Sequence, residues 1–252
     1  MRVRLLCGIF AALLLAASPV QAEITTDYYA SGVPKSEKTL KNGVQHGPTR
    51  WYFKNGNLQL EENYVNGVLQ GPSRVYYESG KLKAELNYKN GLLEGEGKTW
   101  HENGQLMESV RYAAGRQNGE SKAWDENGTL RIDARLKDDR LHGLTHEYSA
   151  TGALLVVRTF RDGRVDGPVT EYYENGKAKH ELVFKNGVLE GPCREYYENG
   201  KLKAERTYKN DLLEGPARVY YPGGSVQREF QYSQGSLLSE KQFDEQGREI
   251  KQ

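Results

Sequence analysis

The sequence has few side chains suited to nucleophilic or metal chemistry. It contains five histidines and two cysteines, and it has no Gly-x-Ser-x-Gly motif that would mark a serine nucleophile. His142 and His146 have the spacing that holds a metal ion on a helix, but they flank a turn and enter an expected strand. Asp125–Gly128 matches only a fragment of a calcium-binding loop, which needs twelve residues of ligand pattern. We therefore predict no catalytic residue, no metal site and no cofactor.

The histidines and carboxylates recur instead at fixed positions of a repeat. His46 and His142 stand directly before a glycine, in a slot that is otherwise filled by Gln70, Glu94, Asn118, Asp166, Glu190 and Glu214. We interpret this slot as a structural one that requires a polar residue. Its carboxylates are better explained as a solvated edge than as a general acid–base pair.

A second repeated slot is the best candidate for function, because it carries tyrosine at both ends of the chain and loses it in the middle. The tyrosines are Tyr77, Tyr173, Tyr197 and Tyr221, and the middle units have His101, Asp125 and Ser149. If they face outward, they form a row spaced by about 10 Å. Exposed tyrosines favour binding of a partner protein, and we predict this role for the four tyrosines. The alternative is cross-strand packing that covers the sheet.

These slots belong to a repeat of 24 residues that runs through almost the whole chain. The segment Tyr76–Asn90 returns nearly unchanged as Tyr196–Asn210, five periods later. One glycine series keeps this step without error: Gly32, Gly56, Gly80, Gly104, Gly128, Gly152, Gly176, Gly200 and Gly224. An aromatic series keeps it too: Tyr28, Tyr52, Tyr76, Trp100, Trp124, Tyr148, Tyr172, Tyr196 and Tyr220. A period of this length is typical of repeat architectures.

Each unit carries two turn signals, of which Asn55-Gly56 and Asn66-Gly67 are examples. Both residue types tolerate a positive φ, which tight hairpin turns require. The segments between the turns are short, rich in Tyr, Val and Thr, and lack helical spacing of apolar residues. Each unit is therefore predicted to be a β-hairpin.

The register of the first turn has two solutions. A three-residue loop, Glu78-Ser79-Gly80, places Tyr76 opposite Leu82, whereas a two-residue loop places Tyr77 there. We favour the three-residue loop with a G1 bulge, in which Gly80 is left-handed, because the equivalents of Tyr76 are always aromatic. The two-residue register has its own support, since it pairs arginine with glutamate across strands in several units, for example Arg74 with Glu85.

The favoured register predicts one apolar face and one mostly polar face. Tyr76, Leu82 and Tyr88 would share the apolar face with Ala84 and Leu86. A single hairpin is not stable in water, so stability must come from the stacking of neighbouring units. We predict an all-β fold: an elongated, single-layer, twisted meander of about nine β-hairpin repeats over residues 23–252.

The first 22 residues form a separate segment. Arg2 and Arg4 precede an apolar run, Leu5–Ala17, that is too short to span a bilayer as a helix. Val20-Gln21-Ala22 fits a cleavage site for a signal peptidase. We predict a signal peptide that is cleaved after Ala22, and a periplasmic or secreted protein.

Cleavage leaves Cys193 as the single cysteine, in a slot that takes small residues, so no internal disulfide is expected. Apolar residues are 37% of the sequence, below the usual share of a globular domain. The formal net charge is +1, so no overall field attracts nucleic acid, and we expect none as a partner.

The units resemble a known repeat. Segments such as Tyr88–Gly95, followed by hairpins such as Tyr196–Gly200, look like the MORN-repeat variant over residues 28–250. In bacteria this variant is found in antitoxin-like repeat proteins, the YwqK-like family. The resemblance implies a single-layer β-meander and a scaffold role more than an activity. It assigns no site residue.

The sequence thus predicts an exported, non-enzymatic repeat scaffold that binds protein partners along an extended sheet surface. Two alternatives remain open: an antitoxin or immunity-type protein that neutralises a toxin, and a module that binds cell-wall glycan or lipid headgroups. Contact with a membrane or the cell wall stays open, and so does assembly into a homo-oligomer.

Overall fold

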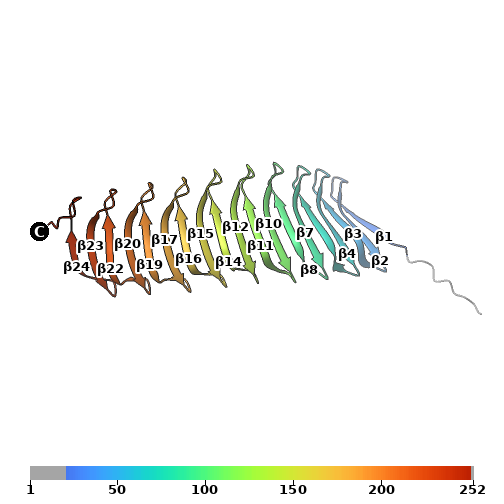
Figure 1. Cartoon of the computed structure of the whole chain (residues 1–252). Coiled ribbons are helices and arrows are strands. Elements are labelled where there is room, and N and C mark those ends of the chain that lie inside the picture. The colour runs from blue at the N-terminus through green and yellow to red at the C-terminus, as the bar shows by residue number, and fades with distance from the viewer. Residues whose placement is uncertain (1–20, 251–252) are drawn as a thin grey trace, which may run out of the picture.

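The computed structural model describes residues 21–250, and within this range it is one antiparallel sheet of 24 strands without helices (Figure 1). The strands are β1 (Glu23–Tyr28), β2 (Pro34–Lys41), β3 (Val44–Tyr52), β4 (Leu58–Val65), β5 (Val68–Leu69), β6 (Gly71–Tyr76), β7 (Leu82–Lys89), β8 (Leu92–Leu93), β9 (Gly95–Trp100), β10 (Leu106–Ala113), β11 (Arg116–Trp124), β12 (Leu130–Lys137), β13 (Arg140–Leu141), β14 (Gly143–Tyr148), β15 (Leu154–Arg161), β16 (Arg164–Tyr172), β17 (Ala178–Lys185), β18 (Val188–Leu189), β19 (Gly191–Tyr196), β20 (Leu202–Lys209), β21 (Leu212–Leu213), β22 (Gly215–Tyr220), β23 (Val226–Ser233) and β24 (Ser236–Gln242).

The strands follow one another across the sheet in chain order. In a typical unit β6 pairs with β7, and β7 pairs with both the short β8 and the long β9 of the next unit. The turns of each kind line up along one long side of the molecule (Figure 1). We call the side with the glycine series of Gly80 the first-turn rim, and the side with Asn90-Gly91 the second-turn rim. The predicted elongated meander is confirmed.

The first turn has the predicted three-residue loop. The Tyr77 N–H donates to the Lys81 carbonyl at 2.8 Å, and the Gly80 N–H donates to the Tyr77 carbonyl at 2.9 Å. Gly80 has a φ of 86°, which is the left-handed conformation that this loop requires. Tyr76 consequently lies opposite Leu82.

A bulge at Lys83 then changes the register within the same hairpin. Beyond it Val75 lies opposite Ala84, and Arg74 lies opposite Glu85. Both registers considered from the sequence are therefore present, one near the turn and one along the strands. The extra residue of a bulge has no partner of its own, so the faces of all later residues on its strand are exchanged.

The predicted division of the faces is therefore wrong beyond the bulge. Tyr76 and Leu82 do share a face, but their companions are Arg74 and Glu85, and we call it the charged face. The other face, which we call the packed face, carries Ser73, Val75, Ala84, Leu86 and Tyr88. Tyr88 thus lies on the side of the sheet opposite Tyr76.

The best-buried residues form a line along the packed face. The slot of Ser73 is the most deeply covered: Thr49, Ser73, Thr145, Val169, Cys193 and Ala217 expose between 0% and 7% of their surface. At Gly97 an added Cβ would lie 2.7 Å from the Leu86 side chain and 2.9 Å from the Tyr112 ring. The slot is small because aromatic and aliphatic side chains of neighbouring strands close over it. Cys193 is accordingly a buried free thiol, and burial raises its pKa.

The second turn is a two-residue loop. Asn90 and Gly91 both have a positive φ, 53° and 78°, which is the geometry of a type I′ turn. Only the Asn-Gly pairs on the second-turn rim adopt it in full. On the first-turn rim the glycine alone has a positive φ, as at Gly56.

The predicted signal peptide, residues 1–22, falls almost wholly outside the described residues, and only Gln21 and Ala22 lie within them, just before β1. Within the described part of the chain, no helix is long and apolar enough to cross a membrane.

Candidate partner-binding surface

The four predicted tyrosines connect each unit to the next one. Their hydroxyls donate to backbone carbonyls of the following unit: Tyr77 to Trp100, Tyr173 to Tyr196 and Tyr197 to Tyr220 at 2.7 Å each, and Tyr221 to Phe243 at 2.9 Å. His101 occupies the same slot and contacts the Trp124 carbonyl at 3.0 Å. This slot therefore links consecutive hairpins along the first-turn rim through a hydrogen bond from one unit to the next.

The rings of these tyrosines are half-buried and partly covered by lysines. Lys83 lies 5.4 Å from the ring centre of Tyr77, and Lys179 and Lys203 lie 5.9 Å from the rings of Tyr173 and Tyr197. These are cation–π distances. The tyrosines do form a row, and its geometry gives each one a structural contact. Their role in partner binding stays a prediction.

The polar slot of His46 and His142 links consecutive units on the second-turn rim. Its side chain accepts a hydrogen bond from a backbone N–H twenty residues ahead in the next turn, as Gln70 does from Asn90 at 2.8 Å and Glu190 from Asn210 at 2.8 Å. His46 lies 3.1 Å from the Asn66 side chain. The expected structural role of this slot agrees with these contacts. Among the described residues, no cluster of His, Cys, Asp and Glu could hold a metal ion.

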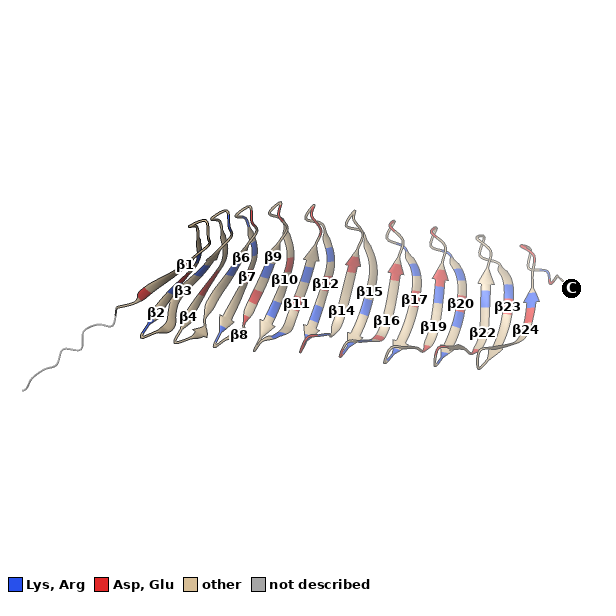
Figure 2. Ribbon diagram, turned by 180° about the vertical axis from the view of Figure 1, so that it is seen from behind, with Lys and Arg blue, Asp and Glu red and all other residues tan. Residues whose placement is uncertain are grey.

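Acidic and basic residues recur on neighbouring strands (Figure 2), and on the charged face of the outer units they form a ladder of ion pairs. Arg74 bridges Glu61 at 3.9 Å and Glu85 at 2.6 Å, and Arg218 bridges Glu205 at 3.5 Å and Glu229 at 2.9 Å. Each bridge joins neighbouring strands, so the ladder runs along the molecule.

Tyrosines of the aromatic series are tied into the same ladder. Tyr52 donates to Glu37 at 2.7 Å, and Tyr220 donates to Glu205 at 2.6 Å. Burial, followed by the hydrogen bond to Glu37, raises the pKa of Tyr52 to about 12. In the outer units the charges of this face are thus largely satisfied by one another.

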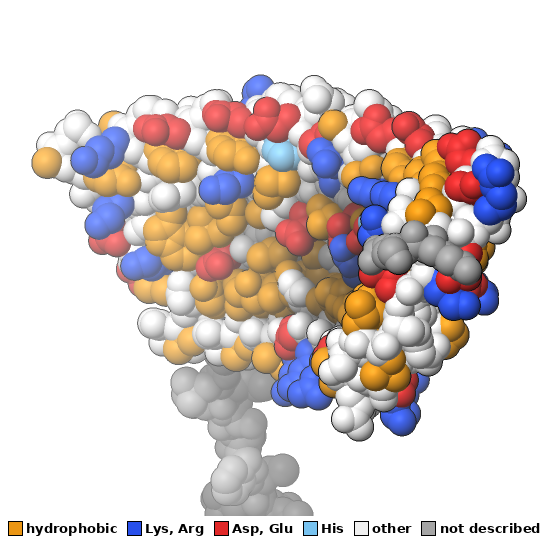
Figure 3. Space-filling view, turned by 90° about the vertical axis from the view of Figure 1, so that its left-hand side faces the viewer, with side chains coloured by type: hydrophobic (Ala, Val, Ile, Leu, Met, Phe, Trp, Pro, Cys, Tyr) orange, Lys and Arg blue, Asp and Glu red, His pale blue; other side chains and the backbone are white. Residues whose placement is uncertain are grey.

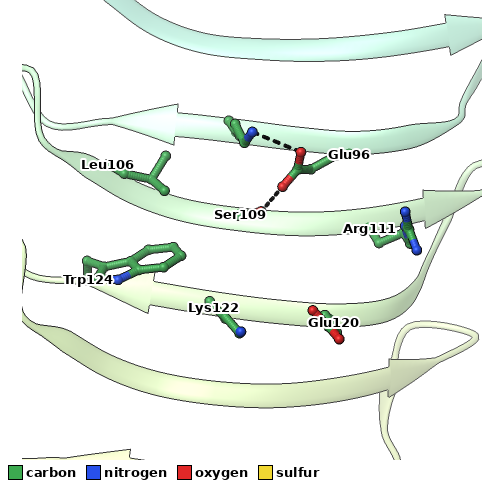
Figure 4. A pocket seen from close by; sticks show the side chains of 8 residues that line it. Glu96, Leu106, Ser109, Arg111, Glu120, Lys122 and Trp124 are labelled. Atoms are coloured by element: carbon green, nitrogen blue, oxygen red, sulfur yellow. Dashed lines mark hydrogen bonds and ion pairs between the residues drawn. The ribbon is translucent and has the colours of Figure 1, made fainter.

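The middle units, residues 95–166, differ from the outer units on this face. Trp100 and Trp124 replace the tyrosines, Ser109 replaces a glutamate, and Glu96 and Glu120 stand where the outer units have proline. A depression of about 420 Å³ opens here between β9, β10 and β11. Figure 4 shows Leu106 and Trp124 at one end of it, and Arg111 and Glu120 at the other.

Most charged residues that line the depression are paired, since Lys122 pairs with Asp133 and Glu120 with Arg135, both at 3.7 Å. Glu96 is bound by Lys98 at 2.8 Å and by Ser109 at 2.7 Å, and these contacts lower its pKa. Arg111 lies opposite Glu96 in the pairing of β10 with β9, but no ion pair to Arg111 exists among the described residues. Seen from the C-terminal end of the molecule, the sheet curves around a hollow whose wall carries both hydrophobic and charged side chains (Figure 3).

These middle residues were not singled out from the sequence. The signal was present in the repeat itself: aligned by the period, Arg111 and Arg135 fill a slot that holds Thr39, Asn63, Asn87, Thr159, Val183, Thr207 and Gln231 in the other units. The loss of tyrosine at His101, Asp125 and Ser149 marks the same region. The residues that depart from the repeat pattern share one face because the bulge sets which residues of each strand point to that face.

Solved structures provide only distant likenesses. A GtfA/B complex bound to UDP and GlcNAc is 19% identical over 47% of this chain and 23% of that chain, with a TM-score of 0.21. A TcdB2–TccC3 complex is 10% identical over 88% of this chain and 14% of that chain, with a TM-score of 0.17. This chain therefore spans less than a quarter of either, and likenesses at this level carry no functional argument. No curated protein matches the chain.

The family comparison is much more specific. Seven stretches match the model described as MORN repeat variant: residues 45–66, 69–90, 93–114, 117–138, 165–186, 189–210 and 213–234. The one unit that it passes over, between residues 138 and 165, belongs to the middle region where the repeat departs most from its own pattern. The matches cover more than half of the residues and keep the period of 24, and this chain therefore belongs to the MORN repeat variant family.

Proposed function

We propose that this protein is an exported, non-enzymatic scaffold that binds protein partners along its extended sheet. The observation that supports the proposal most strongly is the contrast between the outer and middle units. The outer units satisfy their charges internally through the Arg–Glu ladder. Among the described residues of the middle units, the slots of this ladder keep only the pair of Lys122 with Asp133, and the depression presents a tryptophan, a leucine and Arg111, which has no ion pair. Surfaces of this composition favour protein recognition.

The repeat itself is a scaffold, as its family membership indicates. Export rests on the predicted signal peptide, and partner binding rests on the surface. A single-layer sheet leaves both faces uncovered by a second layer of the same chain, so a long surface is available to a partner.

Affinity capture from a periplasmic extract, followed by mass spectrometry, tests the proposal. The bait is the chain from residue 23, and a matched bait carries Arg111→Asn and Trp124→Tyr, which place the outer-unit residues of these slots in the depression. We expect the wild type to retain a defined protein, and loss of that protein by the double variant would assign binding to the middle units. A wild-type bait that retains nothing beyond a bare resin contradicts the proposal.

A further inference from the structure

The second-turn rim changes its chemistry in three consecutive middle units. The first residue after each turn is aliphatic in most units: Val44, Val68, Leu92, Val188 and Leu212, with Ser236 in the last. In the middle units it is Arg116, Arg140 and Arg164, and all three side chains are exposed. The arginines follow one another at the step of the repeat, so they form a row along the rim.

Two of these arginines lie opposite another cation. Lys137 is the ladder partner of Arg140, and Arg161 is the ladder partner of Arg164. Like charges that lie directly opposite each other destabilise a hairpin. Two adjacent units thus keep a local arrangement that costs stability, a pattern that is typical of functional sites.

The local carboxylates neutralise this row only in part. Asp139 accepts a hydrogen bond from the Gln117 backbone at 2.7 Å, and Asp162 lies 3.4 Å from His142. Arg161 is paired with Asp166 at 3.0 Å. Among the described residues no ion pair reaches Arg116, Lys137, Arg140 or Arg164, so these cations are free to meet an anionic ligand.

A second cationic row runs parallel to the first, further in on the charged face. Arg111 packs its aliphatic stem over Gly119, with Cδ 3.1 Å from where a glycine Cβ would lie. Arg135 is the equivalent residue one unit on, and it lies 3.7 Å from Glu120 in a highly exposed pair. Arg111 and Arg135 of this second row line a depression together with Glu120, His142 and Lys137. Lys137 is also the strand partner of Arg140, so it connects the depression to the first row. A ligand that contacts both rows would therefore lie in this depression and along the rim beside it.

We propose that these two rows bind an acidic segment of a partner protein in the polyproline II conformation, an inference that rests on the proposed scaffold function. One repeat unit contains two strands of about 4.8 Å each, so successive arginines are spaced by about 10 Å. A polyproline II helix has three residues per turn and rises by about 3.1 Å per residue, so every third side chain points the same way at about 9.3 Å. Acidic residues at every third position therefore match the row.

Other anionic ligands fit this surface less well. Every third phosphate of a DNA strand also lies about 10 Å further along the axis, but it has turned about the axis by more than a quarter of a turn, so successive ones do not face a row on one side. A flat anionic membrane would contact the rim, but it would not reach Arg111 in the hollow. These ligands are used as arms of the test.

Fluorescence anisotropy with labelled peptides tests the proposal on the chain from residue 23. The probe is four repeats of Glu-Pro-Pro, and its control has the same composition with the four glutamates placed together. The rim variant carries Arg116→Ser, Arg140→Ser and Arg164→Ser, because Ser236 fills this slot naturally. The matched variant carries Lys89→Ser, Lys185→Ser and Lys209→Ser, which removes the same charge from exposed positions of the outer units, and Ser233 fills that slot.

We expect the spaced peptide to bind more tightly than the clustered one, with an affinity that falls as salt is added. The rim variant should lose about tenfold in affinity, the sum of several exposed ion pairs, and the matched variant less than about threefold. Equal loss in both variants, equal binding of both peptides, no binding of the spaced peptide, or preference for phosphatidylglycerol vesicles or an oligonucleotide overturns the proposal. Unchanged circular dichroism spectra establish that both variants fold.

Failure of this inference is distinguishable from failure of the scaffold function. If the rim variant still captures the periplasmic partner of the wild type, the scaffold stands and the acidic segment is wrong. If the wild type captures nothing, the scaffold itself is wrong.

Discussion

At the scale of single residues, the same side-chain type has different tasks on different faces. Tyr77 donates its hydroxyl to the backbone of the next unit, whereas Tyr52, of the aromatic series, donates to the Glu37 carboxylate. The residue types and the period were readable from the sequence, and so was the small slot of Cys193. The partner of each hydroxyl was not, because the carbonyl that accepts from Tyr77 belongs to Trp100, twenty-three residues away, and only the stacking of units brings them together.

The raised pKa of Tyr52 makes a prediction for alkaline pH. In the unfolded chain this phenol ionises near its usual value of 10.0, whereas in the folded chain its pKa is about 12. The stabilising effect is therefore complete below pH 10 and is lost as the pH rises towards 12. Urea denaturation of the wild type and of Tyr52→Phe between pH 8 and 12 measures it.

We expect the stability difference between these two proteins to shrink across that window, since the phenylalanine side chain of the variant has no proton to lose. Comparison with the variant cancels the titration of the lysines, which falls in the same range. A difference that is constant from pH 8 to pH 12 would contradict the assignment.

At the scale of the element, the hairpin was predicted in its turns but not in its faces. The positive φ of Gly80 and of the Asn90-Gly91 pair followed from residue type, because few other residues adopt that conformation. The bulge at Lys83 did not, since nothing in the residue marks it as unpaired. It was visible only as a conflict between two registers, one favoured by Tyr76 and Leu82 and the other by Arg74 and Glu85. The structure resolves the conflict by using both.

A glycine at the junction between the second turn and the long strand makes a testable element-scale prediction. Gly47 has a φ of 117°, and an added Cβ would lie 3.1 Å from the Thr39 side chain. We expect Gly47→Ala to lower the free energy of unfolding by about 1–3 kcal/mol, from backbone strain and crowding together. Chemical denaturation provides the measurement.

Gly223→Ala is the matched control, because Gly223 has no positive φ and nothing lies within 4 Å of its added Cβ. Its effect should stay within about 0.5 kcal/mol. Equal loss in the two variants would show that the cost is the removal of glycine in general and not the geometry of the junction.

At the scale of the whole molecule, stability is the sum of units and of the contacts between neighbours. The tyrosine and polar slots provide such contacts on both rims, for instance at Tyr197 and Glu190. We therefore expect that single units can be exchanged without loss of the fold. The elongated sheet was predictable from the period alone. The surface formed by the unusual residues of the middle units was not predictable, since the bulge decides which of these residues lie on the same face.

The central claim is that the outer units build the scaffold and the middle units bind the partner. It is tested most directly by replacing residues 95–166 with three copies of residues 71–94, which keeps the period of 24 and the number of units. Affinity capture from a periplasmic extract is then compared between this chain and the wild type, with circular dichroism as the check on folding. We predict a folded β-sheet protein that no longer retains the wild-type partner. A folded chain that retains the same partner to the same extent would contradict the claim.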